Sequence, residues 1–61
     1  MNWLYLKKSR CFLNVDHVKE VRVLSTDAID VYSRENPLER LRFTGEDAAK
    51  VIEYLERVAY A

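Results

Sequence analysis

The sequence predicts an α+β fold, in which a four- to five-stranded antiparallel β-meander is followed by one C-terminal α-helix packed on one face. Three observations lead to this prediction. Apolar and polar residues alternate with a period of two through much of residues 3–43, as half-buried strands do. From residue 45 the period changes to 3.6, which is typical of an amphipathic helix. The chain has 61 residues, which suits a single domain over 1–61.

Five short runs have the composition of strands, and polar turns separate them. They cover residues 3–6, 11–15, 18–24, 28–33 and 38–43. The alternation predicts which side chains face the helix, because successive residues of a strand point to opposite faces. From the third run on, these are Val21, Val23, Ile29, Val31, Leu41 and Phe43. Cys11 also lies on the core side of its run, where a free cysteine behaves as a small hydrophobe.

The helix is predicted over about residues 45–60. Its apolar stripe consists of Ala48, Val51, Ile52, Leu55, Val58 and Ala59. Thr44 is a favourable N-cap, and Asp47 three residues later gives a variant of the capping box. Tyr54 and Tyr60 are expected to seal the edge of the core or an interface, because each combines an apolar ring with a polar tip.

Composition restricts the function. One cysteine and one histidine allow no internal disulfide and no closed zinc site, which needs about four Cys or His ligands. We therefore expect no cofactor, no metal and no catalytic residue. A chain this short buries only about 60% of its unfolded surface, so self-association is the expected source of extra stability. Ten basic and ten acidic residues give zero net charge, which disfavours a nucleic-acid footprint without excluding one.

The location is expected to be the cytoplasm. The first residues, MNWLYLKKSR, place their apolar run before the charges, unlike a signal peptide. No run approaches the roughly 20 apolar residues of a membrane span. A single free cysteine fits a reducing compartment.

The run FLNVDHVKEVRV holds the only histidine and allows two interpretations. In the first, Asp16 and His17 form an acid–base or metal site. In the second, the spacing of Val15, Val18 and Val21 by threes marks a single-turn 3₁₀ corner, with Asp16 as its cap and Val18 in the core. The second is favoured, because adjacent strand residues point apart and no further histidine is present.

One sheet face should remain uncovered by the helix and form a homodimer or partner interface. Its candidate residues are Trp3, Tyr5, Phe12, Arg22, Tyr32, Arg40 and Arg42. Whether the first strand or the open sheet face makes the contact stays open. The expected function is that of a small non-enzymatic protein acting through homo-oligomerisation and a protein partner. The alternative is a nucleic-acid-binding or transcription-regulating accessory protein that uses this face.

The run CFLNVDHVKEVRVLSTDAIDVYSRE resembles a pattern of small uncharacterised bacterial proteins, with a strand, an LN-x-D-x-V corner and further alternating strands. The corner and the length are also similar to the flagellar-operon regulators of the FlbD type. The resemblance covers about half of the chain, and its motif is mainly a folding signature. It implies a bacterial protein of this fold and assigns no functional residue.

Overall fold

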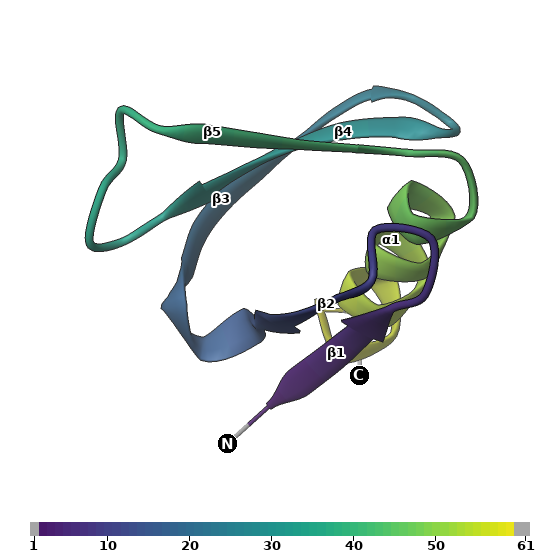
Figure 1. The fold of residues 1–61 in the computed structure, drawn as a ribbon, viewed down its shortest axis with the longest axis horizontal. Coiled ribbons are helices and arrows are strands. Elements are labelled where there is room, and N and C mark those ends of the chain that lie inside the picture. The colour runs from purple at the N-terminus through teal and green to yellow at the C-terminus, as the bar shows by residue number, and fades with distance from the viewer. Residues whose placement is uncertain (1, 60–61) are drawn as a thin grey trace.

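A computed structural model describes residues 2–59 of the chain. The elements in order are β1 (Trp3–Leu6), β2 (Cys11–Asn14), the 3₁₀ turn η1 (Val15–His17), β3 (Val18–Ser25), β4 (Ala28–Ser33), β5 (Arg40–Thr44) and α1 (Gly45–Ala59), as Figure 1 shows. The α+β class, the antiparallel strands and the single C-terminal helix are confirmed.

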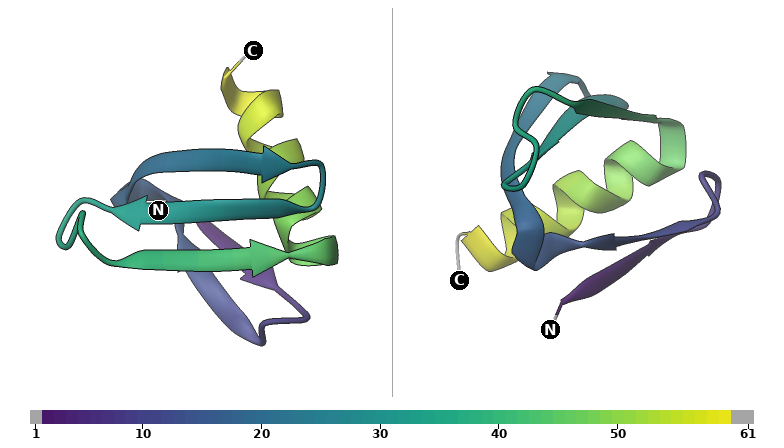
Figure 2. Two further views of the ribbon diagram at one scale, coloured as in Figure 1. Left: turned by 90° about the horizontal axis from the view of Figure 1, so that it is seen from above. Right: turned by 60° about the vertical axis from the view of Figure 1, so that its left-hand side comes forward.

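The strands do not form one meander, and this corrects the sequence prediction. β1 and β2 pair as a separate hairpin, while β3, β4 and β5 form a three-stranded sheet in that order. The turn η1 redirects the chain between β2 and β3, so these consecutive strands are not paired. Figures 1 and 2 show the two sheets on different sides of the core, with α1 between them at one end. The helix accordingly contacts β1 as well as β4 and β5.

The core lies where the hairpin, the sheet and the helix meet. Its buried apolar residues are Leu6, Ile29, Val31, Phe43, Ala48 and Val51. They come from all three parts of the fold, so none of the parts has a core without the others. The predicted stripe of α1 is confirmed over its first four residues, since Ala48 and Val51 are buried and Ile52 and Leu55 pack against this cluster. Val58 and Ala59 were predicted on the same stripe but are exposed, because the last turns of α1 extend past the sheet (Figure 2).

The edge strands are less covered than the sequence predicts. Val23 on β3 pairs with Ile29, and Leu41 on β5 pairs with Val31, so both lie on the helix side of the sheet. They nevertheless remain 60% and 45% exposed. The central strand β4 takes the best-covered position, because one helix and one short hairpin do not reach both edges of the sheet.

Among the strands, one predicted start differs from the structure. β5 begins at Arg40 rather than residue 38, because Leu38 lies in a turn that the Glu39 N–H closes by donating to the Asn36 carbonyl at 3.1 Å. The helix begins at Gly45 as predicted and is described to Ala59. Tyr60 lies outside the described residues. Within residues 2–59, no helix combines the length and the apolar character needed to cross a membrane.

Candidate functional site

The seven candidate residues lie on two surfaces rather than one. Trp3, Tyr5 and Phe12 occupy the outer side of the β1–β2 hairpin, which we call the aromatic face. The others, Arg22, Tyr32, Arg40 and Arg42, lie on the outer side of the three-stranded sheet, which we call the arginine face. The split follows from the two-sheet architecture, because each sheet turns its own outer side to solvent.

The aromatic face is built by the alternation of β1. Leu4 and Leu6 point to the core, so Trp3 and Tyr5 point outward. Tyr5 pairs with Phe12 across the hairpin, and their ring centroids lie 4.9 Å apart at 40°. Trp3, Tyr5 and Phe12 are 54%, 43% and 65% exposed. Three neighbouring large aromatic side chains open to solvent are a recognised mark of a binding surface.

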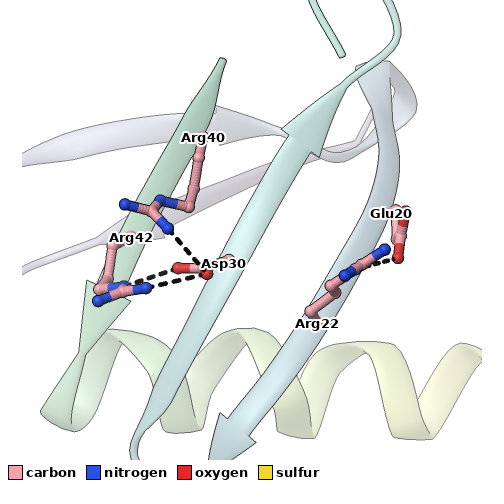
Figure 3. Close-up of polar contacts among 5 residues, drawn as sticks. All are labelled: Glu20, Arg22, Asp30, Arg40 and Arg42. Carbon is pink, nitrogen blue, oxygen red and sulfur yellow. Dashed lines mark hydrogen bonds and ion pairs between the residues drawn. The ribbon is translucent and has the colours of Figure 1, made fainter. Parts of the chain in front are cut away.

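The arginine face is centred on a buried carboxylate. Asp30 on β4 is only 4% exposed although it points away from the helix. Arg42 holds it in a bidentate pair, since Nε donates to Oδ1 at 2.7 Å and Nη2 donates to Oδ2 at 3.1 Å. Arg40 adds an ion pair at 3.9 Å (Figure 3). The hydrogen bond from Arg42 lowers the pKa of the Asp30 carboxyl against the opposing effect of burial.

Arg22 on β3 is also engaged. Its Nε donates to Glu20 Oε2 at 2.6 Å, and its guanidinium lies over the Tyr32 ring, 5.8 Å from the centroid. The hydrogen bond to Glu20 raises the pKa of the Arg22 guanidinium. Figure 3 shows this pair beside the Asp30 cluster. The arginines of this face are thus engaged with neighbouring side chains, Arg22 with Glu20 of its own strand and Arg40 and Arg42 with Asp30 across strands.

The corner between β2 and β3 confirms the second interpretation of FLNVDHVKEVRV and corrects one residue role. η1 spans Val15–His17, but its N-cap is Asn14, whose side chain accepts from the Asp16 N–H at 3.1 Å. The Asp16 carboxylate instead accepts from the backbone and side-chain N–H groups of Asn2, both at 3.2 Å. Either short polar side chain could cap such a turn, which is why the sequence does not separate them.

His17 and Cys11 lie in different surroundings. His17 is exposed at the corner, where its Nδ1 contacts Glu35 Oε1. The backbone N–H of Glu35 and, after it, the His17 ring lower the pKa of the Glu35 carboxyl. Cys11 is half-buried against the core. Among residues 2–59, no three His, Cys, Asp or Glu side chains cluster in a way that could hold a metal ion.

Asp47 in α1 is a buried carboxylate, which the sequence does not predict. Asp47 is 3% exposed and accepts from the N–H of Lys8 at 3.1 Å and from the N–H and hydroxyl of Ser9 at 2.6 and 2.5 Å. The Ser9 hydroxyl is the main cause that lowers the pKa of the Asp47 carboxyl. Asp47 thus ties the hairpin turn to the helix instead of closing a capping box. Only its position in the first helical turn was readable from the sequence.

An apolar groove runs along the free edge of β3 beside the second half of α1. Its volume is about 220 Å³. The residues that line it are Val21, Val23, Ile52, Leu55, Glu56 and Ala59. A second apolar space, enclosed mainly by the hairpin, β3 and α1, measures only about 10 Å³, which is no more than the space of one water molecule. The groove is therefore the larger of these two spaces.

The described residues thus form two exposed surfaces, the aromatic face and the arginine face, an apolar groove, and two buried carboxylate clusters around Asp30 and Asp47. The similarity to FlbD-type regulators stays a prediction. Comparison of the chain with protein-family models, with curated proteins and with solved structures finds no match.

Proposed function

We propose that this protein is a non-enzymatic interaction protein of the bacterial cytoplasm. It self-associates, and it binds a protein partner through a separate surface, the aromatic face. The observation that carries the proposal is the exposure of Trp3, Tyr5 and Phe12 side by side on the hairpin. Aromatic side chains are enriched in protein interfaces, where they bury large areas with few rotatable bonds. Leu4 and Leu6 already supply the core side of β1, so the outer rings are available for a partner.

The charges beside the aromatic face suggest the chemistry of that partner. Lys7, Lys8 and Arg10 lie in or beside the turn that joins β1 to β2, and all three are exposed. A complementary surface would present apolar side chains to the rings and acidic side chains to the turn. The placement of Cys11 against the core and of His17 at the surface supports a role without catalysis.

Nucleic-acid binding by the arginine face gains no comparable support. Arg42 and Arg22 already donate to Asp30 and Glu20, and Arg22 covers one side of the Tyr32 ring. Phosphate contacts would have to replace these bonds. Titration of the purified protein with single-stranded RNA and DNA at two salt concentrations should show no binding even at low salt. Binding that weakens steeply with salt would favour the nucleic-acid alternative instead.

Photo-crosslinking tests the aromatic face directly. A photoreactive phenylalanine analogue is placed at Phe12, and in a matched control at Leu38, which is 94% exposed but lies in the turn before β5. In cells that produce the protein, position 12 should give a crosslink to one protein through a segment with apolar and acidic residues, and position 38 should not. The same products from both positions, or none from position 12, would contradict the proposal.

A further inference from the structure

We propose that self-association joins two copies edge to edge along β3, so that their three-stranded sheets become one continuous antiparallel sheet. The inference rests on the proposed self-association but uses a different surface from the aromatic face. It specifies the partner of β3, the residue at the two-fold axis and the pairs that fix the register. Each of these follows from the exposed groove, the strand order and the charges of β3.

The free edge of β3 is the first part of the argument. β3 comes first in the sheet order β3-β4-β5, so it pairs with β4 on one side only within residues 2–59. It is also the longest strand, with eight residues. An unpaired edge presents a row of backbone N–H and C=O groups that can pair with another strand. A second β3 running antiparallel would satisfy them.

The apolar layer beneath this edge is incomplete in a single copy. Val23 is 60% exposed on the helix side of β3, and Val58 of α1 is 52% exposed. The apolar groove opens between these two elements. The left view of Figure 2 shows the C-terminal turns of α1 extending past β3, beyond the sheet they support. An adjoining sheet would cover both this overhanging helix end and the groove.

Symmetry limits how two β3 strands can pair. In an antiparallel pair related by a two-fold axis, the axis is perpendicular to the sheet, so inner side chains lie opposite inner ones. Val21 and Val23 point to the helix side, because they pair with Val31 and Ile29. Glu20 and Arg22 point to the other side. The two-fold axis must therefore pass between one residue of β3 and the same residue of the second copy. The pairing of β3 with β4 has register shifts after Val18 and after Val23, so the regular part of β3 that can pair again lies between them.

Charge selects between the two central registers. Within one copy, Arg22 Nε donates to Glu20 Oε2 at 2.6 Å. With Val21 on the axis, Glu20 of each copy also lies opposite Arg22 of the other, so two attractive pairs across the axis add to the bond within each copy. With Arg22 on the axis, the two Arg22 side chains oppose each other. Opposite charges stabilise directly facing positions and like charges destabilise them. The alternation of Glu20, Val21 and Arg22 is therefore self-complementary, and a second copy of this chain is the partner that it fits.

Charge exchange tests both the partner and the register. Dimer dissociation is measured by sedimentation equilibrium on the full chain, with far-UV circular dichroism to show that each variant is folded. Glu20→Arg and Arg22→Glu should each weaken the dimer about tenfold, because each turns two attractive pairs into repulsive ones. The double variant E20R/R22E restores opposite charges and should bind within about threefold of the wild type. Val23→Asp should abolish the dimer.

Phe12→Ser is the matched control, since it alters the aromatic face and should leave the dimer constant unchanged. A folded protein that stays monomeric at all accessible concentrations would overturn the inference. So would single charge variants without effect, or an effect of Arg22→Glu that Glu20→Arg does not share. Loss of the dimer in Phe12→Ser but not in Val23→Asp would move self-association to the hairpin. Failure of the crosslink at position 12 would refute the partner surface alone and leave the β3 dimer standing.

Discussion

Among single residues, Gly45 has a backbone that few side chains tolerate. Its φ is 63°, in the left-handed region, where the chain passes from β5 into α1. A Cβ at this position would meet no atom within 4 Å, so backbone strain is the main cost of a substitution. We expect Gly45→Ala to lower the free energy of unfolding by about 1–2 kcal/mol, and Gly45→Asn by less, because Asn adopts this region more readily. Urea unfolding measures both, and equal losses would contradict the strain explanation.

The corner at η1 shows that the sequence predicts the position of a turn better than the residue that caps it. The spacing of Val15, Val18 and Val21 located the corner at η1, because a change of period is a property of several residues together. The cap within the corner was assigned to Asp16, whereas Asn14 makes it. Both side chains have the required oxygen, and the choice depends on Asn2, which reaches Asp16 from the start of the chain. Such a distant partner leaves no local pattern.

Between elements, two side chains of α1 fix the hairpin to the helix through hydrogen bonds. Asp47 accepts from Lys8 and Ser9, and Lys50 Nζ donates to the Tyr5 carbonyl at 2.8 Å. All of these join β1 or its turn to the first turns of α1. The sequence predicts Asp47 only as a residue of the helix start. Its hydrogen bonds to the hairpin turn join residues far apart in the chain, and such contacts leave no periodic pattern in the sequence. The contacts explain why the hairpin packs on α1 although it is not hydrogen-bonded to the larger sheet.

The same contacts make the arrangement of elements sensitive to acid. The folded-state pKa of Asp47, like that of Asp30, lies below the ordinary value of 3.8. The stabilisation that these carboxylates give is therefore present above that value and is lost as the pH falls through the folded-state pKa. We expect Asp47→Asn to lower the thermal midpoint by roughly 5 °C at neutral pH, and to reduce the further loss between about pH 5 and pH 2.

Ser9→Ala provides the companion variant for this acid response. It removes the hydroxyl that is the main cause of the low Asp47 pKa, so the folded-state pKa moves toward its ordinary value. The acid-induced loss should therefore be smaller than in the wild type and should be complete at a higher pH. Thermal unfolding across the pH series, followed by circular dichroism, measures both variants. An Asp47→Asn curve parallel to that of the wild type would show that Asp47 makes no pH-dependent contribution.

At the scale of the whole molecule, the sequence predicted the content of the fold better than its arrangement. Period changes identified the strands and α1, because each period belongs to one element. They did not show that β2 and β3 are unpaired, since pairing depends on how η1 directs the chain. The aromatic and arginine residues were therefore predicted on one surface and lie on two. The exposure of Val23 has the same origin, because the extent of helix cover depends on where α1 crosses the sheet.

The free edge of β3 leads to a prediction about the thermal stability of the whole molecule. If two copies join along β3, unfolding is coupled to dissociation, and the thermal midpoint must rise with protein concentration. We expect a rise of roughly 5–10 °C over a hundredfold range of concentration for the wild type. Val23→Asp, which should abolish the dimer, should give a nearly flat dependence over the same range, while Phe12→Ser should keep the wild-type slope. Calorimetry at several concentrations measures this, and a wild-type midpoint independent of concentration would mean that the single copy is stable with its β3 edge and apolar groove open to water.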